Sequence, residues 1–501
     1  MSYYLILDVG TTAVKAFAYS EDGNIVKRTE KKAPVLFPEP GWVEQDPEKL
    51  WNMVYDASME IIDELGKPLA VGITNQRAST IVWNKDTGEA LYNMITWQDT
   101  RAADLAKEYS KKFVLKFGRG IGKIVSKIFK KSKSKRINYL ITISDFKFGP
   151  NQPIIHLRWL LDNDEELLRL AKEDKLAFGT IDSWIVWKLL RIHVTDYTNA
   201  SATGLFDPFF LKWSDRLTKL LGIPKNILPK LVDNMGNFGK IKLFDDAPLT
   251  AIIADQQSSL FSAGGIQPGV IKMTNGTGTF IDINVGSTPF PARYGTYPMV
   301  AIKWREHVNY LLEGIVQATG SAIDWLIDVG LISDYSEIPT LLESIAEEEL
   351  DLVFIPSFAG LGTPYWNSKA RGLIYGLTRA TRKQHIVKAL LDGIAIRCSE
   401  VIEILEKATG MKIEEIISDG NASKNDYLLQ AIADYSEKIV KRVENLEGTS
   451  RGAFLLAKGG LRNLSISAVF ERPIIDKVFR PRKRRKNRWK QTLELALMLA
   501  K

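Results

Sequence analysis

Short apolar runs alternate with amphipathic stretches along the first part of the chain. Residues 3–7 form an apolar run that ends in a polar turn at 8–12, and residues 13–19 form a second apolar run. This pattern predicts two strands joined as a β-hairpin. Residues 47–65 place apolar side chains at helical spacing, and residues 70–74 are again an apolar strand. Such alternation of strands and helices predicts an α/β architecture.

A change of composition near the middle of the chain predicts two lobes. Helical patterns at 154–172 and 181–191 are followed by a glycine-rich polar stretch at 235–247. We place the boundary in this stretch, which gives lobes at residues 1–243 and 244–501. The length of 501 residues also exceeds the size at which a single core stops growing.

A second hairpin is predicted early in the second lobe. Residues 270–273 and 280–285 are strand-like and are joined by a turn that contains Gly276-Thr277-Gly278. The first hairpin has Gly10-Thr11-Thr12 at the corresponding place. The two hairpins form a weak internal repeat, and the chain has no short-period repeat pattern.

Cysteine content and the amino terminus predict the compartment. Cys398 is the only cysteine, so no internal disulfide can form, and its apolar helical surroundings are typical of core packing. The amino terminus lacks the basic region of a signal peptide, and no apolar run is long enough to span a bilayer. We therefore expect a cytoplasmic protein.

The formal net charge of +8 comes from local tracts. Residues 111–136 hold eleven lysines and arginines and no acidic residue, so the rest of the chain is mildly acidic. Apolar and basic residues recur there at helical spacing, which is typical of a helix on an anionic membrane or partner. Gly118, Gly120 and Gly122 weaken such a helix by about 1 kcal/mol each. The prediction is therefore a solvated loop or insertion, or a locally altered reading of the gene, near 111–148, with membrane-surface contact as the alternative.

A second basic tract lies at residues 480–490. It has no interleaved aromatic residue except Trp489, and an apolar helical pattern follows at 493–499. A nucleic-acid surface would combine basic and aromatic side chains. The tract is therefore interpreted as the solvated start of a terminal helix, and no nucleic-acid partner is expected.

Three glycine turns are candidates for anion binding. Glycine lets the backbone approach a ligand, and successive N–H groups in a turn can bind phosphate. The turns are 8–12, 275–278 and 418–425, and the third leads from a strand into a helix. Each alone also fits an ordinary structural connection, with Ser423 as a helix cap in the third. The doubling of the first two turns, one in each lobe, favours a phosphate clamp. Asp8, at the end of the first strand, could hold a hydrated magnesium ion.

Asp255 is the candidate catalytic base. It follows the apolar residues 252–254, and phosphoryl transfer to an alcohol often uses an aspartate to accept the hydroxyl proton. Spacing alone favours the simpler interpretation of a strand-end aspartate that caps the next helix. The four histidines share no metal-like spacing, so a carboxylate base is the simpler choice for the chemistry.

The order of motifs resembles the glycerol kinase branch of the FGGY carbohydrate kinases over nearly the whole chain. The motifs occupy residues 8–12, 41–46, 72–77, 97–98, 194–201, 254–257, 276–280, 360–366 and 376–379. The resemblance implies an α/β fold with two ribonuclease-H-like, actin/hexokinase-type lobes and an interlobe cleft. It also implies transfer of a phosphoryl group from ATP, with Mg²⁺, to a primary hydroxyl of a small polyol or sugar, and we expect a homodimer.

The same resemblance implies roles for individual residues. Asp255 would be the catalytic base, and Asp8 would position magnesium. The positions that match the ATP site are Thr11, Thr12, Lys15, Gly276, Thr277, Gly320, Ile323, Asp324, Asn421 and Asn425. The positions that match the acceptor site are Arg77, Ala78, Trp97, Asn151, Asp255, Gln256 and Phe280.

Departures from the family pattern bear on the substrate. Glycerol kinases usually have a glutamate where this chain has Ala78 and a tyrosine where it has Asn151. They usually have glutamine and glycine at the places of Asp324 and Asn421. Loss of two hydroxyl partners weakens glycerol binding and leaves room for a longer acceptor. Glycerol leads as the expected substrate, with a xylulose, erythritol or gluconate kinase as the alternative and a non-catalytic nucleotide-binding regulator as the second.

Overall fold

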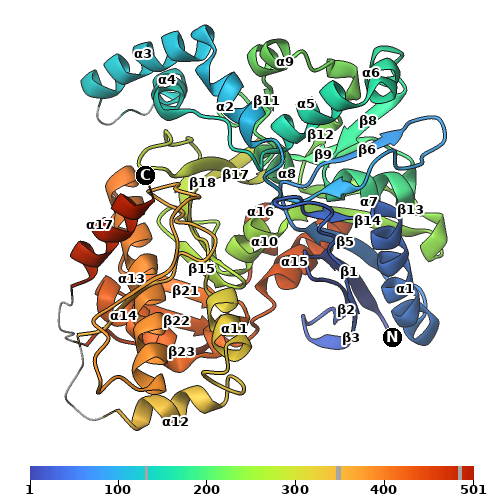
Figure 1. The fold of residues 1–501 in the computed structure, drawn as a ribbon. Helices are drawn as coiled ribbons and strands as arrows, with labels where there is room; N and C mark the ends of the chain where they lie inside the picture. Colours follow the sequence, from blue (N-terminus) through green and yellow to red (C-terminus); the bar gives the residue numbers. More distant parts are fainter. Residues whose placement is uncertain (130–131, 133, 346–350, 483–487, 501) are drawn as a thin grey trace.

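The chain folds around two large β-sheets, one in each lobe (Figure 1). The computed structural model describes residues 1–129, 132, 134–345, 351–482 and 488–500. The first sheet contains, in spatial order, β13 (Met235–Ile241), β14 (Ala247–Ala254), β5 (Ala70–Asn75), β1 (Tyr3–Val9), β2 (Ala13–Ser20) and β3 (Ile25–Lys32). The second contains β17 (Tyr297–Trp304), β18 (His307–Val316), β16 (Thr279–Gly286), β15 (Ile271–Asn275), β21 (Glu415–Asp419), β22 (Ile439–Val443) and β23 (Ile475–Phe479).

The two sheets share one pairing scheme. In the first, β1 pairs antiparallel with β2 and parallel with β5, and β5 pairs parallel with β14. In the second, β15 pairs antiparallel with β16 and parallel with β21, and β21 pairs parallel with β22. Both predicted hairpins are therefore confirmed, and each lies at the centre of its sheet.

The first sheet extends past the boundary expected at residue 243. The glycine-rich stretch contains the strand β13, which pairs antiparallel with β14. Gly236 and Gly239 have φ values of 147° and 138°, which allows the strand to bend at the irregularity in its register. Because β14 lies between β13 and β5, residues 247–254 belong to the first sheet, and the second sheet starts with β15.

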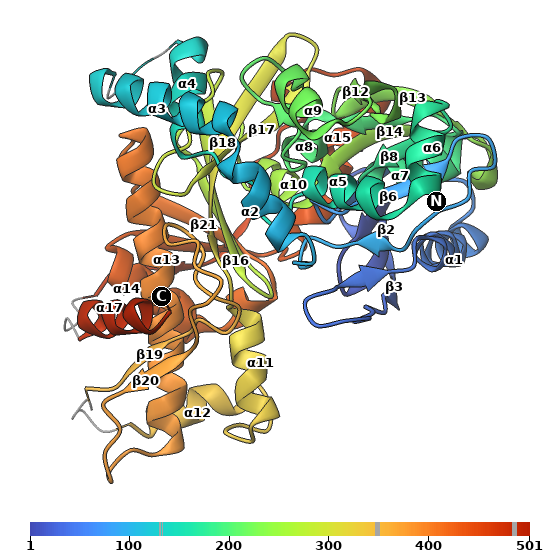
Figure 2. The same ribbon diagram turned by 45° about the horizontal axis from the view of Figure 1, so that its top comes forward.

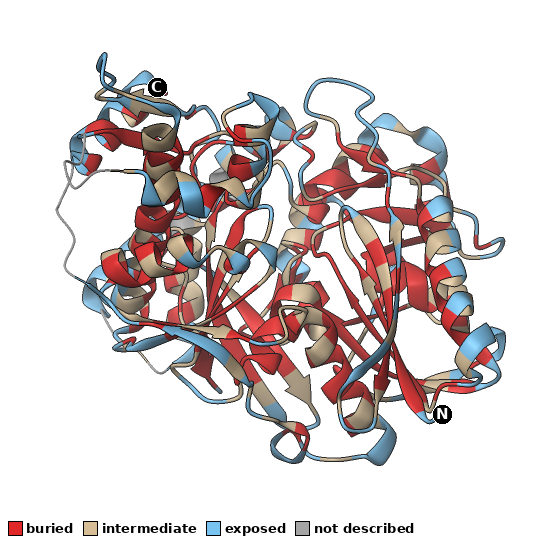
Figure 3. Cartoon of the chain, turned by 90° about the horizontal axis from the view of Figure 1, so that it is seen from below, coloured by how far each residue is buried: buried red, intermediate tan, exposed pale blue. Residues whose placement is uncertain are grey.

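Helices bury both faces of the first sheet. The predicted helix at 47–65 is confirmed as α1 (Pro47–Leu65), and Asp46 caps it by accepting from the N–H groups of Glu48 and Lys49 at 2.9 and 3.0 Å. With α7 (Ile181–Leu190), it shares one apolar core with the sheet. The opposite face is covered by α15 (Gly448–Arg462), whose Phe454 joins a core with Tyr4. Figure 3 shows the inner strands of the sheets buried, whereas edge strands and the outer faces of the helices are exposed.

Close backbone contact holds α15 against the first sheet. A Cβ atom on Gly460 would lie 2.2 Å from the carbonyl oxygen of Thr250, and one on Gly452 would lie 2.0 Å from that of Ser258. Ser258 belongs to α10 (Asp255–Ser262), the helix that follows β14. A segment from late in the chain therefore lies between the two sheets, next to the start of α10.

The predicted helical stretch at 154–172 is two helices, α5 (Pro153–Asn163) and α6 (Glu165–Lys172). Asp164 breaks it, because this extended residue caps α6 with its side chain. The helix predicted at 181–191 is confirmed as α7. Cys398 lies buried in α13 (Lys383–Thr409), as expected, and burial raises the pKa of its thiol to about 12.

The preference for a loop at 111–148 is wrong. This segment forms two packed helices, α3 (Phe113–Ile128) and α4 (Lys135–Asp145), while residues 130, 131 and 133 lie outside the described part of the chain. A Cβ atom on Gly122 would lie 2.5 Å from the carbonyl oxygen of Leu140. The glycines that lower helix propensity therefore permit the close packing of α3 on α4.

The basic tract at 480–490 is only partly described, because residues 483–487 lie outside the described ranges. A terminal helix follows it as predicted, α17 (Trp489–Leu499). Among the described residues, no helix combines the length and apolar character needed to cross a membrane.

The remaining elements are short or peripheral. In the first lobe they are β4 (Glu44–Gln45), β6 (Ile81–Asn84), β7 (Met94–Ile95), α2 (Ala103–Lys111), β8 (Leu176–Gly179), β9 (Val194–Asp196), α8 (Tyr197–Ser201), β10 (Phe206–Asp207), β11 (Lys212–Trp213), α9 (Asp215–Leu221), η1 (Lys225–Ile227), β12 (Lys230–Val232) and η2 (Lys242–Phe244). In the second lobe they are α11 (Gly320–Asp328), α12 (Glu337–Glu343), β19 (Val353–Ile355), β20 (Leu373–Tyr375), η3 (Asn421–Lys424), α14 (Asp426–Ser436) and α16 (Ile466–Val469).

Candidate active site

Asp255 lies at the point where β14 ends and α10 begins, between the two sheets. Its Oδ1 accepts a hydrogen bond from the backbone N–H of Gln256 at 2.7 Å. Burial raises the pKa of Asp255, and the guanidinium of Arg77 opposes this rise. The side chain keeps 25% of its area exposed, so a ligand can reach it.

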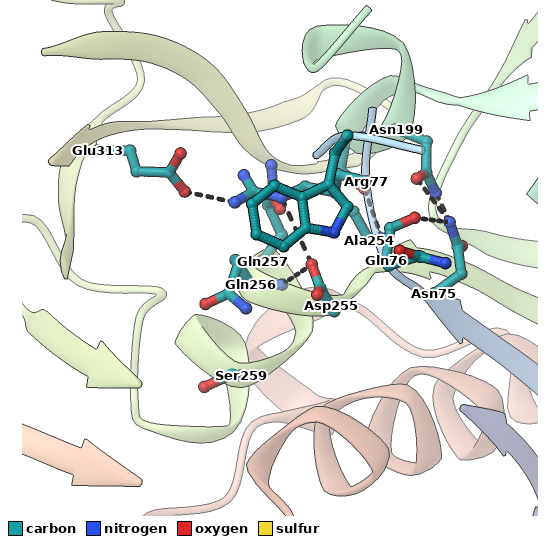
Figure 4. A network of polar contacts seen from close by, with 12 residues as sticks. Asn75, Gln76, Arg77, Asn199, Ala254, Asp255, Gln256, Gln257, Ser259 and Glu313 are labelled. Carbon is teal, nitrogen blue, oxygen red and sulfur yellow. Dashed lines mark hydrogen bonds and ion pairs between the residues drawn. The ribbon is translucent and has the colours of Figure 1, made fainter. Parts of the chain in front are cut away.

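Arg77 joins Asp255 to the second sheet (Figure 4). Its Nε lies 3.4 Å from Asp255 Oδ1, and its Nη2 donates to Glu313 Oε2 on β18 at 2.6 Å. The guanidinium also lies 5.5 Å from the ring centre of Phe280 on β16. Because Arg77 follows β5 of the first sheet, this one side chain contacts groups from both lobes.

A second buried ion pair supports Gln256. Lys272 Nζ on β15 lies 2.9 Å from Asp282 Oδ2 on β16 and donates to Gln256 Oε1 at 2.8 Å. Both members of the ion pair are fully buried. The amide oxygen of Gln256 is thereby held by Lys272, so its amide nitrogen is the hydrogen-bond donor of this side chain, next to Asp255.

The carboxylates of this cluster outnumber its cations by one. Asp282 and Glu313 are directly opposite each other on paired strands. The pKa of Glu313 is raised to about 8. Burial and the charge of Asp282 raise this pKa, whereas the charge of Arg77 lowers it. This raised pKa favours the protonated form of Glu313 near neutral pH, which lowers the excess of negative charge in the cluster.

The first glycine–threonine turn is held by a polar network. Thr11 Oγ1 donates to Gln76 Oε1 at 2.6 Å and accepts from Trp97 Nε1 at 3.0 Å, and Gln45 Nε2 donates to the Thr11 carbonyl at 3.0 Å. The ring of Trp97 meets Phe280 edge-on, with 6.5 Å between ring centres. Phe280 follows the second turn by two residues, so this contact brings the neighbourhoods of both turns together.

The second turn is enclosed by backbone from two other segments. Gly320 donates its N–H to the Gly276 carbonyl at 2.9 Å, and Thr319 donates to the Thr277 carbonyl at 2.9 Å. A Cβ atom on Gly320 would lie 2.6 Å from the Gly276 oxygen, and one on Gly420 would lie 2.5 Å from the Asn275 oxygen. The structure thus brings together the predicted residues Gly276, Thr277 and Gly320, with Thr277 exposed.

Asp8 lies in a cluster of charges beside the first turn. Burial raises the pKa of Asp8 to about 7, Lys15 opposes this rise, and Glu447 and Asp255 add to it. Glu447 is paired with Lys15 at 3.2 Å and with Arg28 at 3.0 Å. A carboxylate among other carboxylates fits a magnesium ion that keeps most of its water. Within the described ranges, no group of three or more metal-ligating side chains forms a complete cage.

Four further predicted residues lie in the second lobe. Ile323 is buried in the core of the second lobe, and Asp324 is exposed and accepts from the hydroxyl of Tyr335. Asn425, and not Ser423, caps α14, because its Oδ1 accepts from the Leu428 N–H at 3.0 Å. Asn421 is exposed at the start of η3.

Sequence comparison places the chain in a family. A profile of the N-terminal domain of the FGGY family of carbohydrate kinases matches residues 3–135 and 123–261, and the C-terminal domain profile matches 271–458. The chain belongs to the FGGY family of carbohydrate kinases. Its two sheets are accordingly the ribonuclease-H-like lobes of an actin/hexokinase-type fold.

Individual FGGY relatives differ in their named substrates. The chain is 38% identical to an uncharacterized sugar kinase of Archaeoglobus fulgidus, across 99% of both chains. It is 37% identical to glycerol kinase 2 of Thermotoga maritima, over 91% of this chain and 90% of that one. The crystal structure of Plasmodium falciparum glycerol kinase with ADP is similar, with a TM-score of 0.84 at 30% identity, covering 99% of this chain and 98% of that one.

Ala78 and Asn151 differ in their surroundings within this FGGY chain. Ala78 directly follows Arg77 and has a φ of 58°, a left-handed conformation that is uncommon for alanine. Asn151 is exposed in the turn before α5. In the described part of the chain, no hydrogen bond joins its side chain to Asp255 or Arg77.

The sequence analysis missed Glu313, Lys272 and Asp282. Each is a charged residue inside an otherwise apolar strand, for example Lys272 between Ile271 and Met273. A fully buried charge is costly unless it is paired, so a charge in a predicted core strand indicates a partner in a neighbouring strand. A charged residue inside an apolar strand can therefore be recognised in the sequence of this FGGY kinase. The residue that pairs with it cannot be identified from the sequence.

Proposed function

We propose that this chain transfers the γ-phosphoryl group of ATP to a primary hydroxyl of a small polyol or sugar, with glycerol as the leading acceptor and glycerol 3-phosphate as the product. The observation that carries this proposal is the position of Asp255. It is a reachable carboxylate beside Arg77 and Gln256, and Arg77 also contacts Phe280, which follows the second glycine–threonine turn. Membership of a carbohydrate kinase family supports the same reaction class.

Asp255 would accept the proton of the acceptor hydroxyl. A hydrogen bond from the Gln256 N–H and the charge of Arg77 favour the ionised carboxylate. Burial acts in the opposite direction and raises the pKa of Asp255, which makes the carboxylate a stronger base than one in water. Arg77 and the amide nitrogen of Gln256 would bind the other hydroxyls of the acceptor, with Trp97 and Phe280 packing on its carbon skeleton.

The ATP phosphates would lie against both turns. Thr11, Thr12 and Lys15 would bind them from the first lobe, and the N–H groups around Gly276 and Thr277 from the second. Gly320 contacts the second turn, and Gly320, Ile323, Asp324, Asn421 and Asn425 would form the nucleoside side of the site. Asp8 would hold a hydrated Mg²⁺, which supplies positive charge to the phosphate oxygens.

A longer acceptor is the second candidate, and Ala78 favours it. A methyl group at this position offers no hydrogen bond to a glycerol hydroxyl. The absence of a larger side chain next to Arg77 also leaves space along the acceptor. Xylulose, erythritol or gluconate would then replace glycerol, with Asp255 unchanged as the base.

An ADP-release assay across a panel of acceptors tests both candidates. The panel contains glycerol, erythritol, xylulose and gluconate at matched concentrations, with ATP and Mg²⁺. We expect the highest kcat/KM for glycerol. Higher turnover on a longer acceptor would replace glycerol by the second candidate, and acceptor-independent ADP release alone would contradict both. Restoring the family residue with Ala78→Glu should shift the preference toward glycerol.

A further inference from the structure

The helix α3 has an outward face that the kinase site does not use. Phe117, Ile121, Ile124 and Ile128 follow each other at intervals of four, three and four residues, which places them in one stripe along the helix. Their exposed fractions are 62%, 40%, 62% and 67%. Solvent-exposed apolar side chains in a continuous row differ from the single exposed ones that are normal on a protein surface.

The inward face of α3 explains why the stripe points outward. Gly122 packs against the backbone of α4, and a Cβ atom on Gly118 would lie 3.2 Å from Ile143 Cγ2. The helix pair is attached to the second lobe through α4. Asn138 Nδ2 donates to the Pro289 carbonyl at 3.0 Å, and the Ala292 N–H donates to Thr142 Oγ1 at 3.0 Å. Figures 1 and 2 both show α3 at the outer edge of the molecule.

Positive charge flanks the stripe. Lys116, Lys123 and Lys127 are exposed and lie in a neighbouring row, about a quarter to a third of a turn from the apolar residues. No acidic residue occurs in the sequence between 111 and 144. The surface therefore offers apolar area and cations together, over a helix of 16 residues.

We propose that α3 is a membrane-surface anchor, which lies in the plane of an anionic lipid bilayer. The stripe would enter the boundary between headgroups and acyl chains, and the lysines would contact lipid phosphates. Each lysine near an anionic surface adds to the attraction. A second copy of the chain fits this face less well, because a symmetric contact would bring two lysine rows together with no acid between residues 111 and 144.

Sedimentation with lipid vesicles tests the anchor. The full-length protein is mixed with vesicles of phosphatidylcholine alone or of equimolar phosphatidylcholine and phosphatidylglycerol. We expect retention by the anionic vesicles only, and weaker retention at high salt. Ile121→Gln with Ile124→Gln, and separately Lys123→Glu with Lys127→Glu, should each lower the vesicle partition coefficient at least about tenfold, the change that a loss of 1.4 kcal/mol produces.

A charge-matched control separates this helix from net charge. Lys219→Glu with Lys240→Glu changes two exposed lysines in α9 and β13 and should keep vesicle retention. All variants should keep the ADP-release rate of the wild type, since α3 contributes no residue to the Asp255 site. That rate also shows that each variant is folded.

Three results would overturn the proposal. They are failure of anionic vesicles to retain the wild type, equal retention of the α3 variants, and lipid-free self-association that Ile124→Gln abolishes. The last result would assign the stripe to a second copy. If the wild type binds a carrier protein with a polyglutamate tag but does not bind vesicles, the stripe would be assigned to an acidic protein partner instead.

Discussion

At the residue scale, Glu313 and Arg77 form the contact that most directly positions the proposed acceptor site. Arg77 has Asp255 on one side and Glu313 on the other, and it is only 8% exposed. Loss of the Glu313 carboxylate would remove one of the two acidic partners of the Arg77 guanidinium. Since Arg77 would bind the acceptor and not the nucleotide, Glu313 is expected to act on acceptor binding.

Glu313→Ala should therefore raise KM for the acceptor while KM for ATP stays within error. A hydrogen bond to a charged group contributes roughly 1.5–3 kcal/mol, so the expected rise is about 10- to 100-fold. Glu313→Gln, which keeps an oxygen that accepts from Arg77, should recover most of the loss. Steady-state kinetics with each substrate varied in turn measures this, and an equal rise in both KM values would indicate a purely structural role.

The buried imidazole ring of His156 makes the free energy of unfolding depend on pH. It is fully buried in α5 beside Thr80, and burial lowers its pKa from 6.5 to about 4. The unfolded chain thus binds the proton more readily than the folded one. The contribution of His156 to the free energy of unfolding is therefore fully present above pH 6.5 and is lost as the pH falls toward 4.

Urea unfolding at pH 7 and pH 5 measures this contribution. We expect the free energy of unfolding to fall by about 2 kcal/mol from this group over the interval. His156→Gln removes the titrating ring and should flatten the curve by that amount. An unchanged slope in the variant would show that other groups cause the pH dependence.

At the element scale, two glycines of α3 give opposite predictions. A Cβ atom on Gly120 meets nothing within 4 Å, whereas one on Gly122 meets the Leu140 oxygen at 2.5 Å and the Ser144 nitrogen at 2.7 Å. Gly120→Ala should stabilise the helix by up to about 1 kcal/mol, and Gly122→Ala should destabilise the α3–α4 contact by about 1–3 kcal/mol.

Amide hydrogen exchange of residues 113–128 distinguishes the two variants. Exchange should slow in Gly120→Ala and accelerate in Gly122→Ala, relative to the wild type. A change of the exchange rate in the same direction in both variants would show that α3 is not packed on α4 as described.

Elements with strong local signals were predictable from the sequence. The helix α1 has a cap, a proline in its first turn and an apolar stripe, so its range was predicted in full. The helix α3 was not predicted, because three glycines lower the local propensity and its packing partner α4 lies in a separate segment. The first-sheet position of β14 was also not predictable, since pairing with β5 joins residues far apart in the chain.

At the scale of the whole molecule, the repeated pairing scheme places a similar turn at the end of the hairpin in each lobe, which supports the proposal of one site between them. The hairpins at residues 3–20 and 271–286 are central in their sheets, and the contacts of Trp97 and Arg77 with Phe280 join the lobes beside the turns. The two turns were predicted from their spacing, and the role of Asp255 was predicted from the family resemblance. The cross-lobe pair of Arg77 and Glu313 was not, because 236 positions separate them and only the folded lobes bring them together.

The central claim is that Asp255 removes the proton from an acceptor hydroxyl next to ATP. The most direct test is turnover and ATP binding of Asp255→Asn, measured by ADP release and by the thermal shift that ATP with Mg²⁺ produces. We predict a loss of kcat of about 10²- to 10⁴-fold with an unchanged thermal shift, because asparagine keeps the shape but accepts no proton. Turnover that stays near the wild-type rate would contradict the assignment of Asp255 as the base.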